Sequence, residues 1–251
     1  KPTHRSRFGR FSPSMGWKAF WSEILIVFLG VLIALAANEA VQNWSWRNKV
    51  QDGEVRMRPD MEYVFNLAAE QYTTEPCVQA QLVTLSQKLA QSESNWAPVT
   101  VYVEDNVRYV VRIPNRTQTF QVWDSLIADG TATRFARERQ STYGYISSRL
   151  VRAQNLNDEA NELGWRLLAL GQSMVLSDDA RRYFLVTIEE MRARYAGSAI
   201  SAGQRMNATS QFGSAPTPEA VEDSLHESGT VKFCKTHGYP LADWRDALKQ
   251  K

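Results

Sequence analysis

One unbroken apolar run stands out in an otherwise polar chain of 251 residues. It extends from Ile24 to Ala37 and reads ILIVFLGVLIALAA. As a helix, the segment from Trp21 to Trp44 would be about 34 Å long, enough to cross a hydrocarbon core of roughly 30 Å. Four tryptophans flank the run at the positions expected of membrane-interface anchors: Trp17, Trp21, Trp44 and Trp46. The pattern predicts a transmembrane helix over residues 17–44.

The charges that precede the run predict its orientation. Residues 1–22 contain no acid and five basic residues: Lys1, Arg5, Arg7, Arg10 and Lys18. Because positive flanks stay in the cytoplasm, we expect a basic cytoplasmic tail over residues 1–16 and a periplasmic domain over residues 45–251, anchored in a bacterial inner membrane. Arg5, Arg7 and Arg10 are expected to contact membrane lipids or partner loops. The rest of the chain is nearly neutral, so nothing indicates nucleic-acid binding.

A cleavable secretory signal is the competing interpretation of this segment. A basic start, a 14-residue apolar stretch and Ala34-Leu35-Ala36 together form an acceptable cleavage pattern. The composition beyond the run, however, continues to favour a helix. We therefore expect an uncleaved anchor.

Helical periodicity dominates the chain beyond the membrane segment. Residues 38–58 suit a continuing helix, which Pro59 is expected to kink or end. Further helices are predicted over residues 60–71 and 77–90, with Pro76 in the first turn of the second. Four apolar residues spaced three and four apart predict one buried face: Val78, Leu82, Leu85 and Leu89.

The second half of the chain adds one β element and several more helices. Alternating valines and a turn-prone Glu104-Asp105-Asn106 predict a hairpin within residues 98–113. Helical patterns follow over residues 117–128 and 135–170, then from Ser177, and last from Thr217 to a stop at Gly229. The predicted fold is mainly α: one N-terminal transmembrane helix followed by an extracytoplasmic helical bundle with a small β-hairpin.

Three segments resemble those of a group of uncharacterised proteobacterial proteins that have one N-terminal membrane anchor and a helical extracytoplasmic domain. The segments read EILIVFLGVLIALAANEAVQNWSWR, EPCVQAQL and SGTVKFCKTHGYPLADWR. The resemblance covers most of the chain and implies the same architecture. It implies no known activity, cofactor or functional residue.

Cys77 and Cys234 are the two cysteines of the chain. An even number of cysteines in an exported domain predicts one disulfide, here between residues 157 positions apart. Two separate buried thiols are the alternative. A metal site formed by Cys77, His226, Cys234 and His237 is a weaker possibility, because a zinc signature has two close ligand pairs. A Cys234–His237 nucleophilic pair would need reducing conditions.

The sequence contains none of the common catalytic or phosphate-binding motifs, and no C-x-x-C-H haem attachment motif. We therefore expect no enzyme activity and no cofactor. The more informative pattern lies inside the span, where residues spaced four and three apart form one face: Glu23, Val27, Gly30, Ala34, Ala37 and Val41. Gly30 and Ala34 form a small-xxx-small pair that allows close helix approach, although small residues are also common in spans generally.

These features favour a non-enzymatic accessory or scaffold subunit of a larger membrane complex, of the respiratory or photosynthetic kind, whose partners are other transmembrane subunits. A sensor-type module that binds a small ligand in its bundle is the alternative. An extracytoplasmic enzyme is the least supported interpretation.

Overall fold

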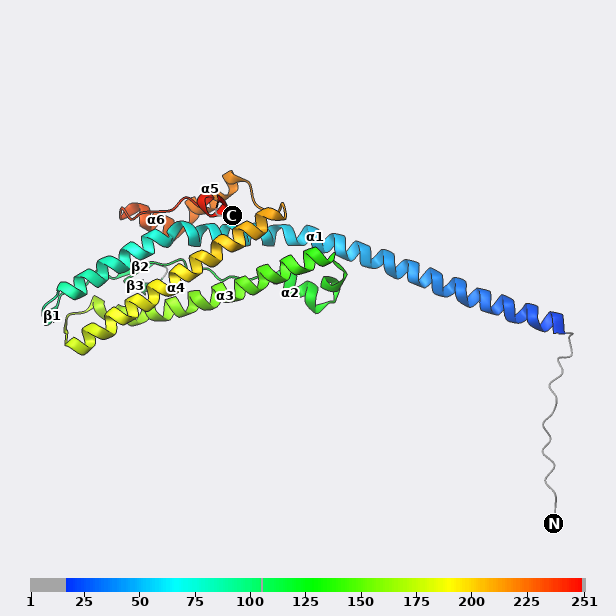
Figure 1. Ribbon diagram of the computed structural model, residues 1–251, viewed down its shortest axis with the longest axis horizontal. Coiled ribbons are helices and arrows are strands. Elements are labelled where there is room, and N and C mark those ends of the chain that lie inside the picture. Colours follow the sequence, from blue (N-terminus) through cyan, green and yellow to red (C-terminus); the bar gives the residue numbers. More distant parts are fainter. Residues whose placement is uncertain (1–16, 105, 250–251) are drawn as a thin grey trace, which may run out of the picture. The chain divides into compact units, whose positions relative to one another are not determined.

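The computed structural model describes residues 17–104 and 106–249 and divides the chain into two units, residues 1–51 and 52–251. Helix α1 (Trp17–Gln91) contributes its first part to the first unit and the remainder to the second (Figure 1). This helix is long and apolar enough to cross a membrane, and its most apolar window is entirely exposed. The long apolar N-terminal helix predicted from the sequence is therefore present.

Helix α1 continues through both of its prolines, which corrects the prediction of separate helices over residues 60–71 and 77–90. A proline inside a helix removes one backbone hydrogen bond and costs roughly 3 kcal/mol. Tertiary contacts compensate around Pro76: Thr74 and Cys77 are fully buried, and the Ala242 amide donates to the Thr73 carbonyl (2.9 Å) in the turn before the proline. Packing and this external hydrogen bond thus outweigh the local preference.

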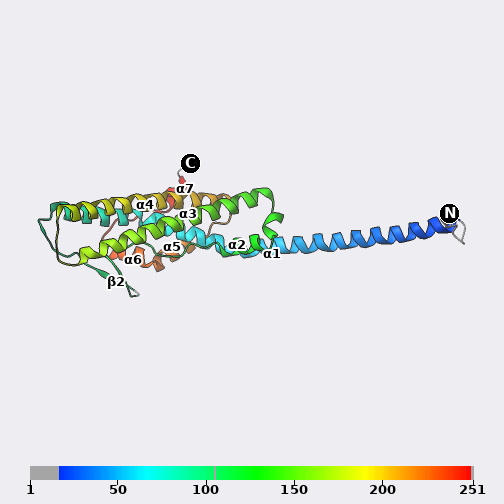
Figure 2. The same cartoon turned by 90° about the horizontal axis from the view of Figure 1, so that it is seen from below.

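The second unit is a bundle in which the later part of α1 packs with α3 (Arg137–Leu167) and α4 (Asp178–Gln211) (Figures 1 and 2). The predicted face of Val78, Leu82, Leu85 and Leu89 is buried and packs against apolar side chains of both helices. The predicted cap Ser177 accepts a hydrogen bond from the Ala180 amide (3.2 Å) at the start of α4. The prediction of a mainly helical bundle is confirmed.

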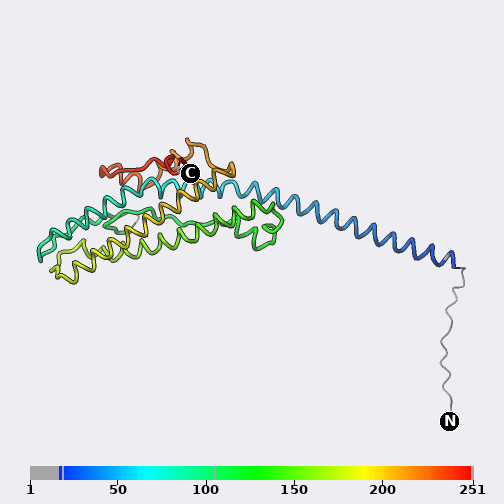
Figure 3. The backbone as a smooth tube through the Cα atoms, in the orientation of Figure 1, coloured from blue at the N-terminus to red at the C-terminus, as the bar shows by residue number. Residues whose placement is uncertain are grey.

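The described residues also form two small antiparallel strand pairs. Strand β2 (Tyr102–Glu104) pairs with β3 (Val107–Tyr109), which confirms the predicted hairpin, and Asn106 adopts a positive φ of 65° at the turn. Strands β1 (Asn95–Trp96) and β4 (Met174–Val175) form a second pair. Strands of two residues carry too little alternation to be predicted. From the hairpin, residues 110–120 run back along the bundle towards α2 (Gln121–Ala128) (Figure 3).

Short helical turns complete the bundle. Two are 3₁₀ helices, η1 (Thr131–Arg134) and η2 (Leu168–Gly171). Helices α5 (Pro218–Glu227) and α6 (Gly229–Thr236) lie against α1 on the side away from α3 (Figure 1), and α7 (Arg245–Lys249) packs on α4 (Figure 2). They pack around Val221 and Trp244, which form an apolar cluster with Phe65 of α1 and Met206 of α4.

The predicted helix that begins at Thr217 is present as α5 and ends just before Gly229, but it is not the last helix. Gly229 is the first residue of α6, and the hydroxyl of Ser228 caps that helix by accepting from the Val231 amide (3.1 Å). Ser228 is fully buried and also donates to Glu70 of α1. The long-range hydrogen bond between Ser228 and Glu70 therefore helps to start a new helix at the glycine that follows α5.

Candidate functional site

A cavity of about 600 Å³ lies in the second unit, between the β2–β3 hairpin with the segment that follows it, α3, and the start of α6. Seven charged residues line it: Arg108, Arg112, Arg116, Lys232, Glu70, Glu104 and Glu227. Its apolar surface includes Val111 and Ile113 of the segment after the hairpin and Met191 of α4. Charged groups of this kind beside an apolar wall can orient a small ligand.

An ion pair between Glu104 and Arg112 forms one side of the cavity. The Arg112 Nη2 atom lies 2.6 Å from Glu104 Oε2, and the Tyr109 hydroxyl donates to the same oxygen at 3.4 Å. Burial raises the pKa of Tyr109, so its phenol stays protonated and remains a donor. The Arg112 guanidinium also lies over the Tyr109 ring, 5.0 Å from its centroid. The carboxylate of the hairpin is thus held by two different donors.

Gly229 permits this ion pair to approach the start of α6. A Cβ atom at Gly229 would lie 2.7 Å from Glu104 Oε1 and 3.0 Å from Arg112 Nη2. The first amides of a helix have no intrahelical acceptor and favour nearby negative charge. The Glu104 carboxylate therefore occupies a position that the α6 N-terminus and Arg112 both stabilise.

The backbone of Arg112 is fixed to α1 by one glutamine. The Arg112 amide donates to Gln81 Oε1 (2.8 Å), and Gln81 Nε2 donates to the Arg112 carbonyl (3.2 Å). The Gln81 side-chain amide thus makes the two hydrogen bonds that a neighbouring β-strand would make to the Arg112 backbone. Gln81 is buried one turn beyond Cys77, so the cavity wall is tied to the part of α1 that carries the disulfide.

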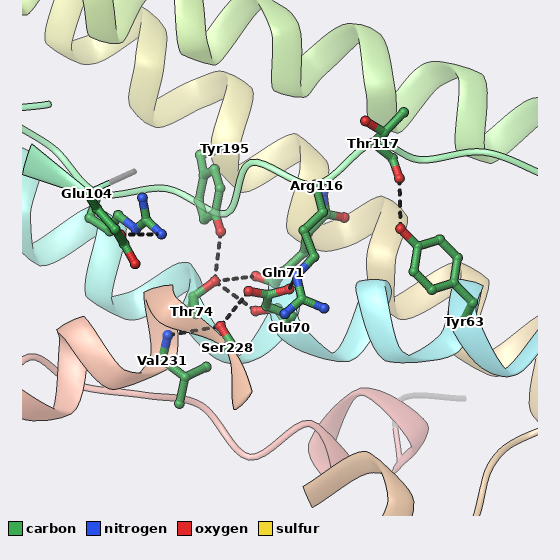
Figure 4. Close-up of polar contacts among 11 residues, drawn as sticks. Tyr63, Glu70, Gln71, Thr74, Glu104, Arg116, Thr117, Tyr195, Ser228 and Val231 are labelled. Atoms are coloured by element: carbon green, nitrogen blue, oxygen red, sulfur yellow. Dashed lines mark hydrogen bonds and ion pairs between the residues drawn. The ribbon is translucent and has the colours of Figure 1, made fainter. Parts of the chain in front are cut away.

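A second polar cluster connects the opposite wall to α1 (Figure 4). Glu70 is 4% exposed, and its carboxylate accepts from the Ser228 hydroxyl (2.5 Å) and pairs with Arg116 Nε (3.2 Å). Next to it, the hydroxyls of Thr74 and Tyr195 lie 2.8 Å apart and connect α1 with α4. Because a buried carboxylate needs partners on every side, these contacts fix the start of α6 and the segment of Arg116 together.

Arg205 is a fully buried cation outside the lining of the cavity. Its guanidinium donates to Gln118 Oε1 (2.8 Å) and to Gln71, both neutral acceptors. Burial lowers the pKa of Arg205 to about 9, which still leaves the group protonated at neutral pH. Arg205 therefore cross-links α4, α1 and the segment before α2, and its role is structural.

The structure joins Cys77 of α1 to Cys234 of α6 through the predicted disulfide, with a Cα–Cα distance of 6.0 Å. Both cysteines are fully buried. The disulfide uses both sulfur atoms, so the alternative of separate thiols and the metal set with His226 and His237 are not realised. Among the described residues, no group of three or more His, Cys, Asp and Glu could hold a metal ion. His237 instead packs on the Phe233 ring, with centroids 4.2 Å apart.

The predicted face of the span lies in the first unit. All six residues are exposed there: Glu23, Val27, Gly30, Ala34, Ala37 and Val41. A Cβ atom at Gly30 would meet nothing within 4 Å. Trp17, Trp21 and Trp44 are exposed, whereas Trp46 is partly buried and has the Lys49 ammonium 4.6 Å from its ring centroid. Arg5, Arg7 and Arg10 lie outside the described residues.

The sequence contains no motif that predicts the cavity. One available signal was the even spacing of Arg108, Arg112 and Arg116, which places three cations on one side of an extended segment. Their partners Glu70, Glu104 and the start of α6 are distant in sequence, and no local pattern connects them.

The fold and these sites define a mainly helical protein with one long apolar N-terminal helix and a disulfide-bonded bundle that carries an open, charged cavity. Comparison of the chain with protein-family models, curated proteins and solved structures gives no match.

Proposed function

We propose that the protein is a non-enzymatic accessory or scaffold subunit of a larger membrane complex, of the respiratory or photosynthetic type. The first part of α1 anchors it in a bacterial inner membrane, its N-terminus is cytoplasmic, and the bundle is periplasmic. Five basic residues before Glu23 support this orientation. The disulfide also supports it, because disulfides persist in oxidising compartments such as the periplasm.

The observation that carries the proposal is the complete exposure of the apolar part of α1. Lipid can cover such a surface, but the face that contains Gly30 and Ala34 also has small side chains on which a second helix can pack closely. In a membrane, helices associate where small residues let their backbones approach closely. A partner helix can therefore approach this face more closely than the opposite face, whose side chains are bulky.

Enlargement of the face tests the proposal. In a Gly30→Leu/Ala34→Leu variant, hydropathy and membrane insertion are preserved, whereas close backbone approach is blocked. We expect co-purifying subunits, identified by mass spectrometry after extraction in mild detergent, to be lost from this variant. Ala36→Leu, which lies off the face, is the matched control and should retain them. Equal retention by both variants would contradict a span-mediated assembly.

The cavity favours a second candidate function, a sensor-type module that binds a small ligand in its bundle. Its volume of about 600 Å³ and its charged lining support this alternative. The two functions are compatible, and each depends on a different unit of the chain.

A further inference from the structure

Several hydrogen-bond donors that line the cavity have no acceptor among the described residues. Within residues 17–104 and 106–249, Arg108 and Lys232 form no ion pair, and both are exposed at the cavity. Arg112 uses Nη2 for Glu104, but its Nε is buried and has no partner in this part of the chain. A guanidinium carries five N–H donors and no acceptor. A ligand group with several hydrogen-bond acceptors, such as a carboxylate or a phosphate, would satisfy these unused N–H donors.

The start of α6 adds backbone donors to the same wall. Ser228 satisfies the Val231 amide, whereas the two preceding amides belong to Gly229 and Thr230, which line the cavity. A helix N-terminus is favourable for anions because these amides point outward and the helix dipole is positive there. Cationic side chains and a helix end thus converge on one cavity.

The Glu104 side chain shows that this wall of the cavity binds a carboxylate. Its carboxylate is held by Arg112 and Tyr109 beside Gly229, and it reaches that position from a hairpin strand of three residues. The Glu104 side chain is 37% exposed, so solvent and small solutes can reach the ion pair that it forms with Arg112. An external anion can compete for the same donors.

The remaining wall is apolar. Val111, Ile113 and Met191 are buried beneath it, and Trp165 is 63% exposed at the cavity. An exposed tryptophan over a buried apolar floor favours a flat or branched apolar body. We propose that the cavity binds a small amphipathic anion, which has one carboxylate or phosphate group on an apolar body. The anionic group pairs with Arg108, Arg112 and Lys232, and Glu104 is its internal competitor.

The site is independent of the span-mediated assembly. Variants in the first unit test the assembly, and variants in the cavity test the ligand, so failure of one proposal leaves the other standing.

Calorimetric titration of the full-length protein in lipid nanodiscs tests the site, with benzoate and phenyl phosphate as probes. Benzamide, which matches benzoate in shape but is neutral, is the ligand control. We expect saturable binding of at least one anion and at least roughly tenfold weaker binding of benzamide. No saturable binding of either anion, or equal binding of benzamide, would overturn the proposal.

Two variants of opposite effect sharpen the test. Arg108→Gln/Lys232→Gln should weaken anion binding roughly threefold to thirtyfold, because it removes two cations that bond to nothing else in the described chain. Arg152→Gln/Arg182→Gln, which removes the same charge from exposed positions on α3 and α4, should leave the affinity unchanged. Glu104→Gln should tighten binding roughly threefold to tenfold, since the internal competitor is lost. Equal weakening by both double variants, or weaker binding by Glu104→Gln in a protein of unchanged helicity, would contradict the site.

Discussion

Removal of the Cys77–Cys234 disulfide is expected to cost the bundle a large part of its stability. The bond closes a loop of 157 residues, and the chain-entropy relation for a loop of that length gives about 5 kcal/mol at 25 °C. For a bundle of this size, a loss of 1 kcal/mol lowers Tm by roughly 2–4 °C, so a Cys77→Ala/Cys234→Ala variant should melt about 10–20 °C below the parent.

The loss should begin at α6. This helix has only eight residues, which is too short for independent stability, and the disulfide attaches it to α1. Hydrogen exchange of the variant should therefore show loss of protection first in residues 229–236, while α3 and α4 remain protected. Because α6 forms one wall of the cavity, anion binding should be lost together with this protection.

Thermal unfolding of the full-length protein in nanodiscs, followed by circular dichroism, measures the effect. A reducing agent should lower the Tm of the parent once the bond is reduced, but should leave the Tm of the double variant unchanged, which serves as the control. A decrease of less than about 3 °C in the variant would refute the loop-closure argument. It would show that the contacts of Ser228, Val231 and Trp244 hold the C-terminal helices without the bond.

Three further predictions concern separate parts of the chain. A reporter fused after Lys251 should be active only if it functions outside the cytoplasm, and a cytoplasmic signal would contradict the orientation. Gly171→Ala should lower the Tm by several degrees, because the new Cβ would lie 2.1 Å from Val101 Cγ2, a stiff β-branched neighbour; an unchanged Tm would contradict this close approach. Burial raises the pKa of Tyr195, so its phenol stays protonated in the fold at a pH where the unfolded chain has lost that proton. The parent should therefore be more stable than Tyr195→Phe by about 1 kcal/mol below pH 10, through the bond to Thr74, and should lose that advantage as the pH rises above 10; a difference that is independent of pH would contradict it.

Elements with strong local signals were predictable from the sequence. The apolar run of the span, the face of Val78 and Leu82, and the cap Ser177 each reflect a pattern that lies within one short segment of the chain. The hairpin was also predictable, since alternation and a turn signal occur together. The disulfide required only a count of cysteines and the expectation of export.

The remaining features depend on contacts between distant segments. Pro76 is a local signal for the first turn of a new helix, yet burial of its neighbours and the bond from Ala242 keep α1 continuous. Gly229 is a local stop signal, yet Glu70 and Ser228 fix it as the start of α6. In both places tertiary packing outweighs a local propensity worth a few kcal/mol.

The candidate site was the least predictable part for the same reason. Its anions and cations come from α1, β2, β3, α5, α6 and the segment after the hairpin, and Glu70 and Ser228 are 158 positions apart. The spacing of Arg108, Arg112 and Arg116 is visible in the sequence, but it becomes meaningful only when α6 closes the cavity.

Photo-crosslinking within native membranes tests the central claim, that one face of the anchor binds a partner helix. A photoreactive residue at Ala37 lies on the face of Gly30 and Ala34, and one at Leu32 lies nearly opposite at 3.6 residues per turn. The account predicts a discrete crosslinked protein of defined mass from position 37 and only lipid adducts from position 32. Lipid adducts alone from both positions, or the same protein adduct from both, would contradict it.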